Sequence, residues 1–260
     1  MLIGRDAGGV SVRTYVQLFQ QIIAALEVVD RLHFPGRMHR LDWAVQSTTS
    51  EDDTLVAHLA PRSVSSRRPI NSVDMTAAAL VNGVAVLEHT PEIPRYFDER
   101  VIDRVRMVGD RLGQHGVRSI GVSNQDRHAS IDDDVRRNAR EAITEASSAY
   151  SSLVGRLDVI SNRRDRLRVG LLTDQSRAVI CEVDRLDRRL VLDHFDKRVV
   201  VAGLLRRNAL GQPVKLEAES IEVLPPQEPR ASAYELLGLM ADDPRSTEQV
   251  MDDVRGRRAG

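Results

Sequence analysis

The sequence predicts an α+β protein, with an α+β N-terminal domain, a closed β-barrel of five strands and a short helical tail. Apolar residues in the first half recur at three- and four-residue steps, as in helices that pack one face on a sheet. The second half has short apolar runs that alternate with polar residues or turns, as in strands. Two short amphipathic segments end the chain after the proline-containing stretch PPQEPRAS.

These changes of pattern set the expected domain boundaries. Residues 1–128 are expected to form the α+β domain, and residues 129–150 a connecting helix. Residues 151–225 should form the barrel, and residues 226–260 the linker and helical tail. A chain of 260 residues is long enough to bury two small cores.

In the first half the pattern predicts helix, two strands, two helices and one strand. The expected ranges are 14–32, 41–45, 54–60, 74–87, 101–112 and 117–122. STTSEDD (47–53) is expected to be the loop between the first two strands. PRSVSSRRPINS (61–72) has no periodicity and is expected to be a mobile surface loop.

A helix is expected from Ile131 to Tyr150, with Ser130 and Asp133 placed as a capping box at its start. Three carboxylates, Asp132 to Asp134, occupy its first turn. Metal binding is one interpretation of this run. Capping is favoured, because negative charge is stabilised at the positive end of a helix.

The second half predicts the element order βββαββ. The expected strands cover 153–160, 167–172 and 178–183, a short helix covers 184–195, and a final hairpin covers KRVVVAGLLRRNALGQPVKLEAESIEVL (197–224). Gly155 would let the first strand coil, and a change of alternation predicts a register shift near Ser220. This order resembles the OB-fold, a Greek-key barrel that implies an oligonucleotide or oligosaccharide ligand. A generic small β-barrel is the alternative.

The OB-fold resemblance implies that two arginine-bearing loops flank one ligand face. The six arginines are Arg163, Arg164, Arg166, Arg168, Arg206 and Arg207. Arginine binds phosphate through two parallel hydrogen bonds, so this edge predicts contact with single-stranded nucleic acid. Phe195 is the only aromatic residue in 151–225, which leaves a purely structural barrel as an alternative because single-strand binding commonly uses aromatic stacking.

The tail is expected to bind a protein partner through short amphipathic helices. Its candidate contact residues are Leu236, Leu237, Met240, Val250, Val254 and Arg255. The segment resembles the toxin-wrapping C-terminal segments of bacterial antitoxins, which implies a nuclease toxin as partner and an arginine that enters its acidic active site. The long first domain departs from the small DNA-binding domains of antitoxins, and docking of the tail on its own chain is the alternative.

Other classes of function lack sequence support. The chain has no Walker loop, HExxH, GxSxG or GxGxxG motif, so no cofactor and no metal site are predicted. Cys181 is the single cysteine and is expected to be a small buried hydrophobe. No signal peptide or membrane span is predicted, so a cytoplasmic location is expected.

The favoured function is therefore that of a non-enzymatic binding or regulatory protein, antitoxin-like or associated with nucleic acid. The net charge of −1 gives no overall attraction to nucleic acid, so any such site must be local. An enzyme whose active site lies in the N-terminal domain, using Arg62, Arg67 or Arg68, is one alternative. A structural adaptor is another.

Overall fold

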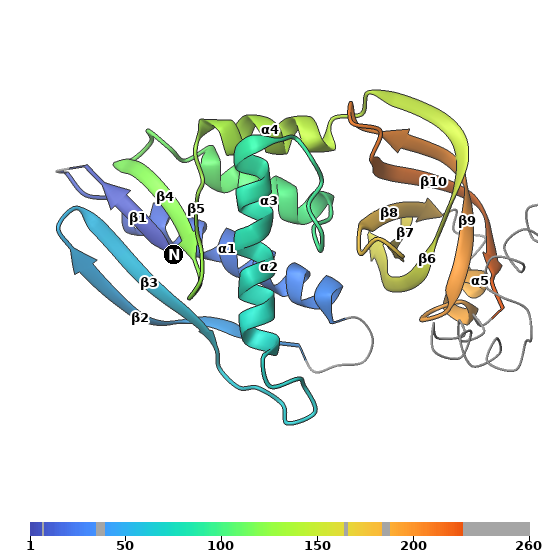
Figure 1. Ribbon diagram of the computed structural model, residues 1–260, viewed down its shortest axis with the longest axis horizontal. Coiled ribbons are helices and arrows are strands. Elements are labelled where there is room, and N and C mark those ends of the chain that lie inside the picture. The colour runs from blue at the N-terminus through green and yellow to red at the C-terminus, as the bar shows by residue number, and fades with distance from the viewer. Residues whose placement is uncertain (7, 35–39, 164–165, 184–187, 226–260) are drawn as a thin grey trace, which may run out of the picture. The chain divides into compact units, whose positions relative to one another are not determined.

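A computed structural model describes residues 1–6, 8–34, 40–163, 166–183 and 188–225 (Figure 1). The predicted fold class is confirmed: helices and an antiparallel sheet are followed by a closed barrel. Residues 1–224 form one compact unit. The tail residues predicted to bind a partner lie outside the described part of the chain.

The N-terminal part contains one antiparallel sheet of five strands in the order β2-β3-β1-β4-β5. Its strands are β1 (Leu2–Arg5), β2 (Trp43–Glu51), β3 (Thr54–Pro61), β4 (Val117–Ser123) and β5 (His128–Ser130). Its helices are α1 (Val12–His33), α2 (Ser72–His89), α3 (Glu99–Gly109) and α4 (Asp133–Ile143). The first four strands with their crossover helices have the order of a split βαβ arrangement.

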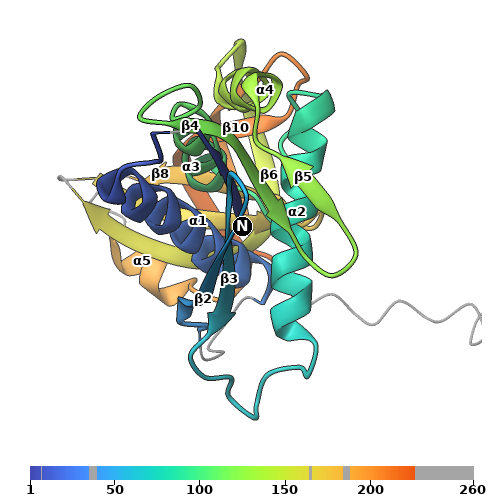
Figure 2. The same ribbon diagram turned by 90° about the vertical axis from the view of Figure 1, so that its left-hand side faces the viewer.

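Strands β1 and β5 are absent from the sequence-based prediction. β1 is only four residues long, yet it lies in the middle of the sheet between β3 and β4, and the amino terminus lies there too (Figure 2). The ammonium group of Met1 donates a hydrogen bond to the carbonyl oxygen of Ala57 at 2.9 Å. A strand this short has too few residues to display a period, which is why the pattern missed it.

Two expected boundaries and one expected cap residue in this part are wrong. Residues 47–51 belong to β2, and the turn is Asp52–Asp53, with Asp52 at φ 48°. The connecting helix ends at Ile143, because its buried stripe of Val135, Ala139 and Ala142 ends there. Its cap is Asp132, whose Oδ1 accepts a hydrogen bond from the amide of Val135 at 2.9 Å, so the acidic run does cap the helix although Ser130 does not.

The loop 61–71 is anchored in the core by Arg68, contrary to the expectation of a mobile surface loop. Arg68 and Asp30 form an ion pair in which both side chains are 1% exposed. Thr76 Oγ1 also donates to the Asp30 carboxylate, at 3.3 Å, and the Arg68 guanidinium lies 4.9 Å from the centre of the Phe34 ring. A buried ion pair needs such additional partners, because both charges have left water.

His33 stacks between two aromatic rings beside this pair. Its ring centre lies 4.7 Å from that of Phe34 and 4.0 Å from that of Tyr96. Burial lowers the pKa of His33 from its ordinary value of 6.5, and the nearby Asp30 carboxylate opposes this only in part. The folded state therefore favours the neutral ring.

We expect the free energy of unfolding to fall as the pH is lowered through 6.5, because the unfolded chain then binds a proton that folded His33 resists. His33→Phe keeps an aromatic ring in the stack and removes the titration. Urea unfolding between pH 7.5 and pH 5 should show a smaller loss of stability in His33→Phe than in the wild type. Parallel curves for the two proteins would contradict this account.

The barrel strands close in the order β10-β8-β7-β6-β9, and the predicted element order βββαββ is confirmed. The elements are β6 (Ser147–Arg163), β7 (Arg166–Thr173), β8 (Ala178–Val183), α5 (Arg188–Asp193), β9 (Arg198–Arg207) and β10 (Pro213–Val223). β10 pairs in parallel with β8, and every other pair is antiparallel. This is the arrangement expected of an OB-like barrel.

One detail of the barrel prediction is confirmed, Gly155 has a packing role, and one boundary changes. The register of β10 against β9 shifts between Ala218 and Ser220, as expected. Gly155 allows close packing, because a Cβ there would lie 2.4 Å from the carbonyl oxygen of Leu172. The barrel begins at Ser147 rather than at residue 151, since the first residues of β6 pair with the end of β9.

Candidate functional site

The six arginines of the predicted barrel edge do not gather at one place among the described residues. Arg206 and Arg207 pair with Ser148 and Ser147 at the beginning of β6. The backbones of Arg163 and Arg166 pair at the other end of that 17-residue strand. Arg164 lies outside the described residues, and Arg168 lies further along β7. The long first strand therefore separates the two predicted loops.

Partners within the chain already engage the arginines near the β9–β10 turn. Arg206 forms ion pairs with Glu145 and Glu217, and hydrogen bonds to these two carboxylates raise its pKa. Arg207 Nη1 donates to the carbonyl oxygen of Gly211 at 2.9 Å. Both side chains thus have structural partners at this turn, and two carboxylates beside Arg206 already offset its charge.

The β9–β10 turn holds the segment between α2 and α3. Gln212 Oε1 accepts a hydrogen bond from the amide of Ile93 at 2.7 Å, and Asn208 Nδ2 donates to the carbonyl oxygen of Ala142 at 3.1 Å. Both amide side chains are buried. Arg177, in the β7–β8 turn, adds an ion pair with Glu92 at 2.9 Å. The tip of the hairpin thus fixes the barrel to the helices.

Arg168 belongs to a different group of charges, on the outer face of β7, β8 and β10. Glu182 lies between Arg168 and Lys215, at 2.9 and 3.0 Å from their nitrogen atoms. Glu182 is 8% exposed, whereas the Arg168 side chain is 53% exposed. The guanidinium therefore keeps donors that face solvent, in front of the two strands that form the ligand face of OB-like barrels.

A cleft of about 700 Å³, here named the barrel cleft, lies between this face and helices α1 and α3. Its volume is within the range of ordinary ligand pockets. Seven of its lining side chains are charged: Arg31, Arg100, Arg104, Arg168, Glu27, Glu99 and Asp103. The barrel cleft thus combines four arginines with three carboxylates.

Helix α3 supplies four of these charges from its first two turns. Asp98 caps the helix through the amide of Val101 at 3.0 Å, and the same carboxylate accepts a hydrogen bond from Arg100 Nε at 2.7 Å. Arg104 Nη1 donates to Gln21 Oε1 on α1 at 2.9 Å. An arginine has five donors, so these contacts orient Arg100 and Arg104 without exhausting them.

Glu99 lies in the barrel cleft opposite the barrel cations. The loss of water around its carboxyl group raises its pKa, and neighbouring Asp98 and Asp103 add to the increase. Lys215 and Arg168 act in the opposite direction. The charges of the barrel face and of α3 therefore influence each other across the cleft.

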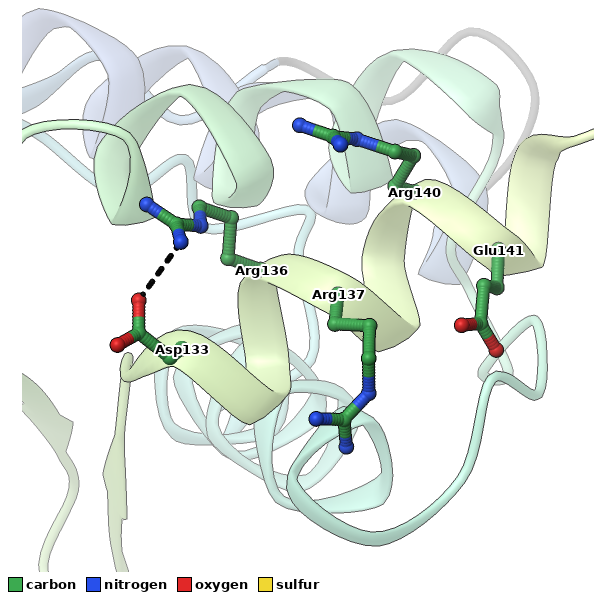
Figure 3. Close-up of a pocket in the computed structure, with 5 residues that line it drawn as sticks. All are labelled: Asp133, Arg136, Arg137, Arg140 and Glu141. Atoms are coloured by element: carbon green, nitrogen blue, oxygen red, sulfur yellow. Dashed lines mark ion pairs between the residues drawn. The ribbon is translucent and has the colours of Figure 1, made fainter.

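A second pocket lies on α4 and is lined by Asp133, Arg136, Arg137, Arg140 and Glu141. Arg136 and Arg140 project from one side of α4, whereas Arg137 projects from another (Figure 3). Ile143 follows on the side of Arg136 and Arg140 after one further turn, and it lines the barrel cleft. Arg136 is paired with Asp133 at 2.9 Å.

Sequence reasoning missed the barrel cleft because its walls come from distant parts of the chain. One local signal was present. In ERVIDR (99–104), an acid followed by an arginine occurs twice at a spacing of four residues, so one helix face presents both pairs. The segment was interpreted only from its apolar stripe, which predicts an amphipathic helix, and its charged residues were not considered.

Features of other functional classes are missing from the described part of the chain. It contains no group of three His, Cys, Asp or Glu side chains able to hold a metal ion, and no helix long and apolar enough to cross a membrane. Cys181 is buried as predicted, and burial raises the pKa of its thiol to about 12.

No protein-family model matches this sequence, and neither does any curated protein.

The arginines considered for an enzyme in the N-terminal domain have separate environments. Arg62 lies at the surface, 3.5 Å from Asp42, and Arg67 is exposed. Arg68 is buried in the ion pair with Asp30, so its guanidinium does not face solvent. These three side chains do not form a site together.

Proposed function

We propose that this protein is a non-enzymatic binding protein that holds a short single-stranded nucleic acid in the barrel cleft. The observation that carries the proposal is the position of Arg31, Arg100, Arg104 and Arg168 in one cleft, in front of β7 and β8. OB-like barrels bind oligonucleotides on this face, and arginine suits phosphate. The proposed site is the barrel cleft and not the predicted barrel edge. Arg168 belongs to both.

Arg100→Ala with Arg104→Ala is expected to weaken binding of a fluorescein-labelled 15-nucleotide single strand about tenfold or more at low salt. The plot of log affinity against log salt should also become less steep, by about 0.7 for each phosphate that the variant no longer neutralises. Fluorescence anisotropy at several salt concentrations measures both quantities. A thermal melt of the variant checks that it is folded.

The matched control is Arg13→Ala with Arg67→Ala, which removes the same charge from exposed positions outside the barrel cleft. Arg13 and Arg31 lie at opposite ends of α1, about 27 Å apart along the helix axis. This control should keep the affinity and the salt dependence of the wild type. If the two double variants bind equally, or if the wild type binds no oligonucleotide, the proposed function is wrong.

A further inference from the structure

The carboxylates of the barrel cleft need an explanation, because they repel phosphate. Asp103 is satisfied within the chain by Arg106, whose Nη2 lies 2.7 Å from its Oδ1. Glu27 and Glu99 accept no hydrogen bond from any described residue. Glu27 is exposed, whereas the carboxyl group of Glu99 has lost part of its water although other atoms of the residue reach solvent. Without these two carboxylates, the barrel cleft would bind phosphate more tightly.

The carboxylates and arginines are arranged in couples. Helix α1 presents Glu27 and Arg31 four residues apart, so the two lie on one face. Helix α3 presents Glu99 with Arg100, and Asp103 with Arg104, one turn later. Because Asp103 is held by Arg106, the couples of Glu27 with Arg31 and of Glu99 with Arg100 are the ones that bring an unoccupied acceptor and a cation to the same cleft.

The ligand that matches this lining carries both an anion and a hydroxyl donor in every repeating unit. A ribonucleotide has one phosphate and one 2′-hydroxyl group, whatever its base. A deoxyribonucleotide has the phosphate but not the hydroxyl donor. Base amino groups could also donate to a carboxylate, but they vary with the sequence of the strand, whereas the 2′-hydroxyl group is present in every ribonucleotide.

We infer that the acid–arginine couples of α1 and α3 select single-stranded RNA over DNA, with Glu27 and Glu99 accepting hydrogen bonds from 2′-hydroxyl groups. This inference rests on the proposed function and adds the class of nucleic acid to it. In DNA the same carboxylates meet no 2′-hydroxyl donor, and their repulsion of phosphate remains. The carboxylates thus discriminate between RNA and DNA, and the arginines supply the affinity for the phosphates of either strand.

The test compares three 15-nucleotide probes of one uridine- or thymidine-rich sequence: RNA, DNA and 2′-O-methyl RNA. Wild-type protein should bind RNA about tenfold more tightly than either other probe, since a hydrogen bond to a charged group contributes at about this level. The 2′-O-methyl probe keeps the phosphates and the ribose oxygen but lacks the donor. It therefore separates recognition of the hydroxyl from recognition of sugar shape.

Glu27→Ala with Glu99→Ala should bind DNA more tightly and RNA less tightly than the wild type, so that the ratio of affinities approaches one. Asp126→Ala with Glu222→Ala, exposed outside the barrel cleft, makes the same change in net charge and should leave the ratio unchanged. Equal wild-type affinity for RNA and DNA, or the same ratio in both double variants, overturns the inference and leaves the proposed function standing. Absence of binding to every probe overturns both.

Discussion

Arg68→Ala is expected to lower the free energy of unfolding by about 4 kcal/mol, because it leaves the charge of Asp30 buried without its partner. Asp30 is fully buried, and among the described residues its remaining donors are the amide of Leu41 and Thr76 Oγ1, both at 3.3 Å. The Thr76 hydroxyl also lies 2.9 Å from the carbonyl oxygen of Ser72 and has one proton for the two acceptors. The substitution also removes the guanidinium from the Phe34 ring. Chemical unfolding followed by the fluorescence of Trp43, which is buried in the same core, measures the change.

The neighbouring Arg67 provides the matched control. Its side chain is exposed, so Arg67→Ala should change the free energy of unfolding by no more than about 0.5 kcal/mol. Asp30→Leu combined with Arg68→Met should be less destabilising than Arg68→Ala alone, since neither charge is then left behind. Equal stability of Arg68→Ala and Arg67→Ala would show that the ion pair is solvated in solution.

This ion pair also shows where sequence reasoning fails. Residues 61–71 are polar and aperiodic, a pattern that predicts a mobile loop, and nothing in the segment itself indicates that Arg68 turns inward. The sequence feature that points to a buried ion pair lies in α1. Asp30 follows Ile22 and Leu26 on the buried face of that helix, and a carboxylate in such a position requires a partner.

Periodicity predicted the long elements well because the apolar residues within each of them recur at the spacing of its buried face. α1 and β8 were found to within two residues at each end, and the bulge of β10 was visible as a change of alternation. Residues 47–51 and 147–150 were missed as strands for the opposite reason. They are mostly exposed serine and threonine residues whose strand conformation comes from pairing with β3 and β9.

The site was less predictable than the fold, because it depends on which surfaces meet. The composition of the β9–β10 turn suggested an anion site, yet its buried Asn208 and Gln212 bind the helical part, and Arg206 is held by two carboxylates. Arg168 was selected for its place near a loop. The arginines that line the barrel cleft with it, on α1 and α3, are more than 60 residues away in the chain.

Gly203→Ala is expected to destabilise the barrel by about 3 kcal/mol, at the upper end of the effects of overpacking. A Cβ at Gly203 would lie 1.9 Å from the carbonyl oxygen of Glu217 and 3.0 Å from the amide nitrogen of Glu219. Both are backbone atoms, so a side-chain rotation cannot relieve the contact. Gly203 lies beside the register shift of β10, which brings the two backbones together there.

The strain should spread through the closed ring of strands, because β9 pairs with both β6 and β10. Hydrogen exchange followed by mass spectrometry should show faster exchange in peptides from these three strands than in peptides from α1. Gly8→Ala is the control, since a Cβ there meets no atom within 4 Å, and its exchange and melting should match those of the wild type. If Gly203→Ala also matches the wild type, β10 must lie farther from β9 in solution, and the register that closes the barrel is wrong.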